Sequence, residues 1–125
     1  MISAIGFISL IFSIALNLFT IIIYFIKKNI LDKRLFYYSL YFGVFFITIS
    51  FLSLICAYIV SDFTNFNVFQ NSHSNKPLIY KITGTWGNHE GSMLLWLMTM
   101  SYYNLFFSFN NILEENLKKL TIVVQ

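Results

Sequence analysis

The chain has 125 residues, of which 58% are apolar and only 10% are charged. A water-soluble domain carries about a quarter charged residues, so this composition excludes an ordinary soluble enzyme and indicates a polytopic membrane protein. The formal net charge of +3 comes without a basic tract interleaved with aromatic residues, so we expect no nucleic-acid binding. The single cysteine, Cys56, cannot form an internal disulfide. It lies in an apolar run with no base nearby in sequence, which favours a packed core thiol, and its role is otherwise open.

Three apolar segments predict transmembrane helices. Residues 2–26 contain no charged side chain and are long enough to cross a hydrocarbon core of roughly 30 Å. Because this segment lacks the basic start and small-residue cleavage site of a signal peptide, we expect a retained helix. Further helices are predicted at about 35–60 and 92–109, and 120–125 resembles the start of another. Tyrosines near both ends of the second segment favour the membrane interfaces: Tyr37, Tyr38, Tyr41 and Tyr58.

Packing roles are predicted for the small and aromatic residues of these segments. Gly43, Ser50 and Ser53 are expected to be points of close helix packing. The phenylalanine clusters are expected to face lipid or neighbouring helices: Phe42, Phe45, Phe46, Phe106, Phe107 and Phe109.

The polar segment 61–91 separates the second and third predicted helices and is expected to be a long loop. Basic residues concentrate elsewhere, in the connections after the first and third helices: Lys27, Lys28, Lys33, Arg34, Lys118 and Lys119. By the positive-inside rule these connections face the cytoplasm or matrix, so the N-terminus and the 61–91 loop face the periplasm or intermembrane space. The predicted fold class is all-α: one membrane domain over 1–125, a helical bundle with three transmembrane helices and one long outward-facing loop.

The stretch 81–96 (KITGTWGNHEGSMLLW) holds the chain's most unusual residues. One interpretation is a well-formed helix start at the membrane interface. Trp86 and Trp96 would then lie in the aromatic belt, Asn88 or Ser92 would cap the helix, and Glu90 would lie at its positive end. Its glycines, Gly84, Gly87 and Gly91, would permit backbone conformations or approaches that other residues block.

The other interpretation of this stretch is a functional site around His89. This residue fits a haem or metal ligand, a proton carrier or a packed polar group. Together with His73 it does not make a metal site by spacing, so we expect no metal.

Three parts of this region resemble the N-terminal part of CcmF-type proteins, the haem lyase subunits of cytochrome c maturation system I. They are Ser61-Asp62-Phe63, Pro77-Leu78-Ile79-Tyr80 and the run Thr85 to Trp96, T-W-G-N-H-E-G-S-M-L-L-W. Ser61 departs from the asparagine of the family's N-D-F pattern. Such proteins are also found split in some mitochondria, and the resemblance implies a split or truncated N-terminal piece.

The resemblance further implies covalent attachment of haem b to apocytochrome c on the outer face of the membrane. The family's haem ligands and tryptophan-rich segment would lie outside this chain, so catalytic residues are unknown and no complete catalytic site is expected here. Trp86, His89, Glu90 and Trp96 would form a surface towards haem or apocytochrome.

The implied partners are the remaining pieces of the haem lyase, apocytochrome c and a haem-delivery chaperone, in the lipid bilayer of the mitochondrial or, alternatively, bacterial inner membrane. The alternative function is a small structural or assembly subunit of another membrane complex, such as a respiratory complex, with no catalytic role. A channel or transporter fragment is disfavoured, because the three predicted spans contain no charged residue.

Overall fold

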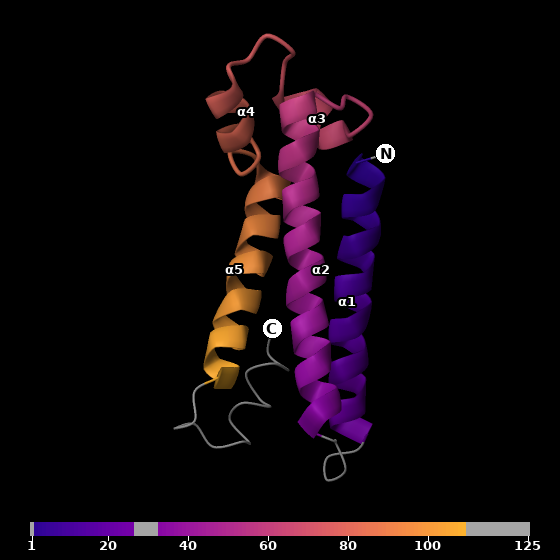
Figure 1. Ribbon diagram of the computed structural model, residues 1–125. Coiled ribbons are helices and arrows are strands. Elements are labelled where there is room, and N and C mark those ends of the chain that lie inside the picture. The colour runs from indigo at the N-terminus through magenta and orange to yellow at the C-terminus, as the bar shows by residue number, and fades with distance from the viewer. Residues whose placement is uncertain (1, 27–32, 110–125) are drawn as a thin grey trace.

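The computed structural model describes residues 2–26 and 33–109, and within these ranges the regular secondary structure is helical (Figure 1). The helices are α1 (Ile2–Ile26), α2 (Lys33–Val60), α3 (Phe66–Asn71), α4 (Leu78–Gly84) and α5 (His89–Phe109). The predicted all-α class is therefore confirmed for this part of the chain. The possible helix at 120–125 and the basic turn before it lie outside the described residues.

The three long helices lie side by side with α2 in the middle (Figure 1). α1 packs along one side of α2 and α5 along another, so that α1 and α5 meet α2 rather than each other. The short helices α3 and α4 lie at one end of the bundle, beside the C-terminal end of α2 and the beginning of α5. We call this the α3–α4 end, and it carries the unusual stretch 81–96.

Small and hydroxyl-bearing residues let α1 and α2 approach closely. A Cβ atom added at Gly6 would lie 2.8 Å from the Ser53 Oγ, so a larger residue there would force the Ser53 side chain to shift. The Ser13 hydroxyl donates to the Gly43 carbonyl at 3.2 Å, and Ser50 is buried. Close backbone approach and interhelical hydrogen bonds are how membrane helices associate, so the packing roles predicted for Gly43, Ser50 and Ser53 are confirmed.

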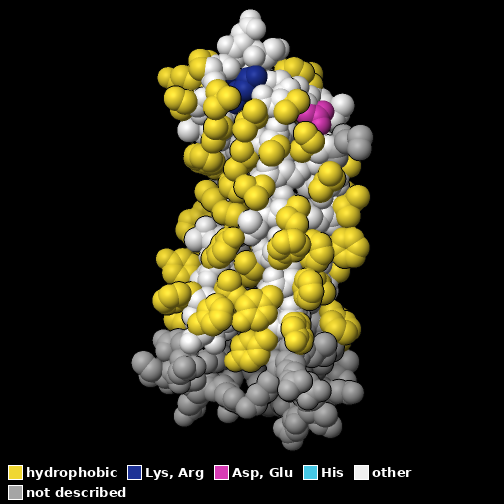
Figure 2. All heavy atoms as spheres, viewed as in Figure 1, with side chains coloured by type: hydrophobic (Ala, Val, Ile, Leu, Met, Phe, Trp, Pro, Cys, Tyr) yellow, Lys and Arg dark blue, Asp and Glu magenta, His cyan; other side chains and the backbone are white. Residues whose placement is uncertain are grey.

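The outside of the bundle is covered with large apolar side chains (Figure 2). Phe42, Phe45, Phe106, Phe107 and Phe109 are exposed, and Phe46 stacks on Phe12 with ring centroids 5.7 Å apart, as predicted for lipid-facing and packing residues. Cys56 is also exposed on α2. The prediction that Cys56 packs in the core is therefore wrong, because Cys56 lies on the face of α2 that points out of the bundle.

Two segments of the described residues are long and apolar enough to cross a membrane, Ile2–Ile22 and Tyr37–Val60, each with a mean hydropathy of 2.4. With the exposed apolar surface, they indicate a membrane protein. α5 has 21 residues but is less apolar than these two segments, so the third predicted span is not confirmed and stays a prediction.

The segment predicted as the 61–91 loop is more regular than expected, because it contains α3, α4 and the first turn of α5. α2 ends at Val60, and Ser61 takes the left-handed conformation with φ of 57°. The Asp62 N–H then donates to the Ala57 carbonyl at 2.9 Å, and the Ser61 N–H to the Tyr58 carbonyl at 3.2 Å. This Schellman-type ending turns the chain sharply back over the bundle.

Candidate functional site

The turn from Thr85 to Ser92 connects the end of α4 to the start of α5, and Asn88 caps α5. The Asn88 Oδ1 accepts from the Gly91 N–H at 2.7 Å, which satisfies one of the free donors of the first helical turn. Asn88 is thus the cap, one of the two predicted candidates. Ser92 is not the cap, since its hydroxyl donates to the His89 carbonyl inside the helix.

Gly91 is the glycine of this turn that the packing requires. A Cβ atom at this position would lie 1.7 Å from the Thr85 carbonyl oxygen, and Thr85 is completely buried. At Gly87, by contrast, an added Cβ would meet nothing nearer than 3.5 Å. Neither glycine has a positive φ. The predicted close backbone approach is therefore real, and it falls on Gly91 because the first turn of α5 lies directly against the end of α4.

A partly buried polar network ties this turn to α2 and α3. The Tyr58 hydroxyl donates to the Asn67 Oδ1 at 2.5 Å and accepts from the Asn88 Nδ2 at 2.7 Å. The Asn67 Nδ2 donates to the Asn88 Oδ1 at 3.1 Å. Three segments far apart in sequence thus meet through three side chains around the buried Tyr58, and polar groups that satisfy one another in this way favour a single geometry.

The sequence analysis missed this network. It placed Tyr58 in the aromatic belt, which is wrong, because Tyr58 is completely buried. Asn67 could not be recognised as a network residue from the sequence, because its partners Tyr58 and Asn88 lie 9 and 21 positions away in the chain. The polar hydroxyl of Tyr58 beside an otherwise apolar span was the one available hint.

Glu90 lies in the first turn of α5, as predicted, where a carboxylate is favoured by the helix dipole. Its Oε2 accepts from the Asn67 Nδ2 at 3.1 Å, so the side chain leans towards α3. Across the described ranges 2–26 and 33–109, no basic side chain forms an ion pair with it. Glu90 also lines a cleft between α1 and α5.

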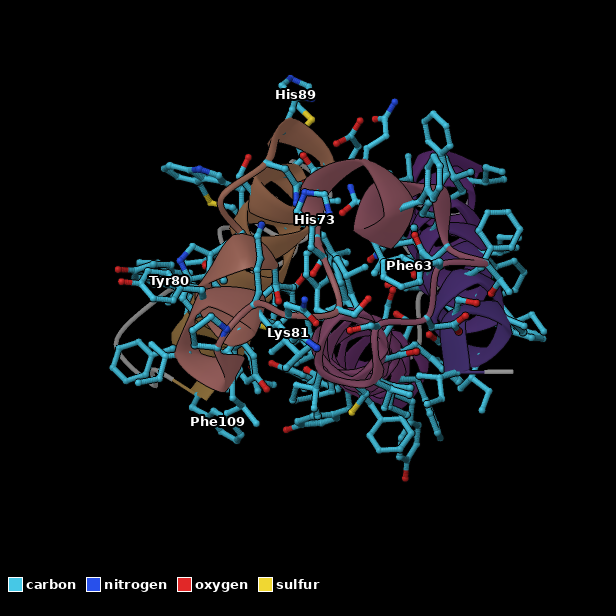
Figure 3. The ribbon with its side chains drawn as sticks, turned by 90° about the horizontal axis from the view of Figure 1, so that it is seen from above. Phe63, His73, Tyr80, Lys81, His89 and Phe109 are labelled. Atoms are coloured by element: carbon cyan, nitrogen blue, oxygen red, sulfur yellow. The ribbon has the colours of Figure 1, made fainter. Side chains whose placement is uncertain are left out.

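His89 and Trp96 lie on another face of α5. They are seven residues apart, close to two helical turns, and therefore share one side of the helix with Met93 and Met100. All four side chains are exposed, and we call them the α5 outer stripe: His89, Met93, Trp96 and Met100. Figure 3, viewed onto the α3–α4 end, shows His89 pointing away from the bundle.

The four predicted site residues are therefore not gathered into one pocket. His89 and Trp96 belong to the stripe, Glu90 turns towards Asn67, and Trp86 lies on the turn with 39% of its surface exposed. His73 does not converge with His89 (Figure 3). Within the part of the chain that the structure describes, no group of three or more His, Cys, Asp or Glu residues is placed to hold a metal ion.

Asp62 organises the sharp turn after α2. The Thr64 hydroxyl and backbone N–H both donate to its Oδ1, at 2.5 and 3.2 Å, and the Ser3 hydroxyl lies 3.5 Å from its Oδ2. The hydrogen bond from the Thr64 hydroxyl is the main reason that the pKa of Asp62 is lowered below its usual value. The neighbouring Ser61 hydroxyl accepts from the Lys81 ammonium at 2.6 Å, which fastens α4 to the end of α2.

Comparison with known proteins tests the resemblance proposed from the motifs. The chain is 52% identical over 80 residues to the cytochrome c-type biogenesis protein CycK of Rhizobium meliloti (strain 1021), a match that covers 63% of this chain and 12% of that protein. It is 43% identical over 70 residues to the cytochrome c-type biogenesis protein CcmF of Escherichia coli (strain K12), covering 56% and 10%. The matched region is thus similar to proteins named for cytochrome c-type biogenesis, CcmF among them, in agreement with the resemblance seen in the motifs.

A plant protein extends the comparison beyond bacteria. The chain is 36% identical over 90 residues to a probable cytochrome c biosynthesis protein of Daucus carota, covering 56% of this chain and 15% of that protein. The chain thus spans only about an eighth of the length of the curated CcmF-type relatives it matches. No protein-family profile and no solved structure matches it.

Proposed function

We propose that this chain acts in cytochrome c maturation, as one part of a membrane haem lyase complex that attaches haem covalently to apocytochrome c. The observation that carries the proposal is its 52% identity over 80 residues to a cytochrome c-type biogenesis protein. The matched region corresponds to about an eighth of its relatives, so in this proposal other segments complete the lyase. As the family resemblance implies, those segments would bear the haem ligands. Haem b and apocytochrome c are the substrates of the assembled complex.

The described residues favour an exposed contact surface for haem or apocytochrome rather than a pocket that ligates haem. A haem held between two histidines needs imidazoles that face each other, and His73 and His89 point to different places (Figure 3). The α5 outer stripe instead offers an imidazole, two thioethers and an indole on one exposed face. Met and Trp side chains suit contacts with flat aromatic partners, so this face is the surface we assign to haem or apocytochrome.

The cap of α5 explains how such a surface is held in place. Asn88 and Gly91 fix the start of α5 against α4, and Tyr58 fixes the same turn against α2. His89 is therefore presented from a rigid helix start. A functional side chain on a packed helix is positioned more precisely than one on a loop.

We propose α5 as the third membrane span, since its 21 residues measure about 31 Å at 1.5 Å per residue. The α3–α4 end would then face the intermembrane space or periplasm, in a mitochondrial or bacterial inner membrane. The support is the asymmetry of the basic residues, which are dense in the connections at the other end.

The test is covalent haem in c-type cytochromes, measured by haem staining after a denaturing gel, in cells whose chain is replaced by single variants. His89→Ala, Met93→Ala and Trp96→Ala, all on the α5 outer stripe, should each lower the stained cytochrome severalfold at unchanged membrane levels of the chain. Tyr80→Ala is the matched control, since Tyr80 is 66% exposed, close to the 64% of Trp96, but lies on α4. Normal staining in all three variants would contradict the proposal.

A second function has one observation in its favour. Several residues of the run Thr85 to Trp96 have structural roles, because Asn88 caps α5 and Gly91 packs on Thr85. This suits a structural or assembly subunit of another membrane complex. Copurification separates the two: recovery of the other CcmF-like segments favours the haem lyase, whereas a respiratory complex without them favours the assembly subunit.

A further inference from the structure

A cleft of about 290 Å³ lies between α1 and α5, with α2 as its floor, near the α3–α4 end. Its lining changes character along its length. Ser3, Asn65, Asn67 and Glu90 provide polar atoms at the α3–α4 end. Further along the helices, Phe7, Leu10 and Leu94 form apolar walls, and the hydroxyl-bearing Ser50 and Ser53 of α2 lie in the floor. The cleft is thus polar at one end and mainly apolar beyond it.

The cleft runs along the helices for a length that suits part of an acyl chain. Ser3 and Leu10 both line it, and seven residues of helix rise about 10 Å. Because α1 is one of the two apolar segments able to span a membrane, this direction leads from the membrane boundary into the hydrocarbon region. An amphiphile aligned with the bilayer lipids therefore matches its direction and its change in polarity.

The charge at the polar end selects the headgroup. Among the described residues that line the cleft, Glu90 is the one that carries a charge. Asn67 donates to one of its oxygens, and carboxylate oxygens can accept further hydrogen bonds. Ser3, on the opposite wall, points its hydroxyl to a second carboxylate, that of Asp62. A cationic group is favoured here, and a primary ammonium offers three donors, whereas a quaternary ammonium offers none.

We propose that the α1–α5 cleft binds a phospholipid with a primary-amine headgroup, its ammonium at Glu90 and one acyl chain along Phe7, Leu10 and Leu94. This site is independent of the haem lyase proposal. It would fill the space that α1 and α5 leave open over α2.

The test uses the full chain in nanodiscs that contain equal amounts of phosphatidylethanolamine and phosphatidylcholine with identical acyl chains. The lipids that stay bound after gentle release are counted by native mass spectrometry. The wild type should retain the ethanolamine lipid about two- to fivefold over the choline lipid, the range expected of one partly exposed ion pair. Glu90→Gln should bring this ratio close to one, and Leu94→Trp should lower the amount of both lipids by filling the cleft.

Lys76→Gln is the control, because Lys76 carries a charge at the same end of the bundle, between α3 and α4, without lining the cleft, and its retained ratio should equal that of the wild type. Equal retention of the two lipids by the wild type would overturn the proposal. So would a Glu90→Gln ratio that stays at the wild-type value in a protein of unchanged helix content. A cleft that carries no lipid and is filled by another polypeptide in the purified complex would overturn it as well.

Discussion

Replacing Gly91 by alanine should open the α3–α4 end of the bundle. The new methyl group would lie 1.7 Å from the Thr85 carbonyl oxygen, far inside van der Waals contact. Because Thr85 is completely buried, its backbone has little room to move, and the start of α5 must shift instead. That shift also pulls the Gly91 N–H away from Asn88, so the helix loses its cap.

The magnitude follows from three effects. Overpacking in a tight site costs about 1–3 kcal/mol, and loss of an asparagine cap costs about 1 kcal/mol. Alanine recovers up to about 1 kcal/mol, because it restricts the unfolded chain more than glycine does. The net destabilisation of the α4–α5 turn is therefore about 1–3 kcal/mol, which corresponds to an increase of about 5- to 100-fold in the population of the open turn.

Tryptic cleavage at Lys81 in proteoliposomes measures this population, since proteolysis follows local opening when the segment closes faster than it is cut. Gly91→Ala should be cut about 5- to 100-fold faster than the wild type. Gly87→Ala is the matched control, because its methyl group would meet nothing nearer than 3.5 Å, and its cleavage rate should change less than threefold. Equal rates for the two variants would refute the argument from close packing.

Three further changes test the same end of the bundle. Tyr58→Phe removes the hydroxyl that Asn88 donates to and should destabilise the turn by about 1–2 kcal/mol, seen as faster cleavage at Lys81; an unchanged rate would mean that the network contributes nothing. The pKa of Asp62 is lowered in the folded protein, so its carboxylate stabilises the fold fully above the usual value of 3.8, and this stabilisation is lost as the pH falls through the lower native pKa. Wild-type tryptophan fluorescence should change over that acid range, and Asp62→Asn should remove the change. The same acid transition in both proteins would contradict the role given to Asp62. Ser61→Gly and Ser61→Ala both lose the hydrogen bond from Lys81, but only glycine adopts the positive φ of this position without strain. The glycine variant should therefore be more stable than the alanine variant by about 1 kcal/mol in the cleavage assay. Equal stability of the two variants would argue against strain at this residue.

The long helices were predictable because they depend on local information. Uncharged apolar runs bounded by polar residues predicted α1 and the end of α2, and Asn88 was one of the two residues predicted to cap α5. The start of α5 was predicted three residues late, at 92, because the polar side chains of His89 and Glu90 resemble a loop. They occupy the first helical turn all the same, since Asn88 caps it and the helix dipole favours a carboxylate there.

The arrangement at the α3–α4 end was not predictable in the same way. Tyr58, Asn67 and Asn88 meet only after α2 turns back at Ser61, so their contacts depend on tertiary structure. The separation of His89 and Glu90 onto different faces of α5 also depends on three-dimensional structure. His89 and Glu90 are neighbours in sequence, but the helix directs them about 100° apart, one outwards and one towards α3.

The central claim is that this chain is needed for covalent haem attachment. The most direct measurement is haem staining of c-type cytochromes after the chain is depleted, with apocytochrome levels followed by immunoblot. The account predicts that stained cytochrome c is lost while apocytochrome is still made, and that the intact chain restores the stain. Undiminished haem staining after complete depletion would contradict it.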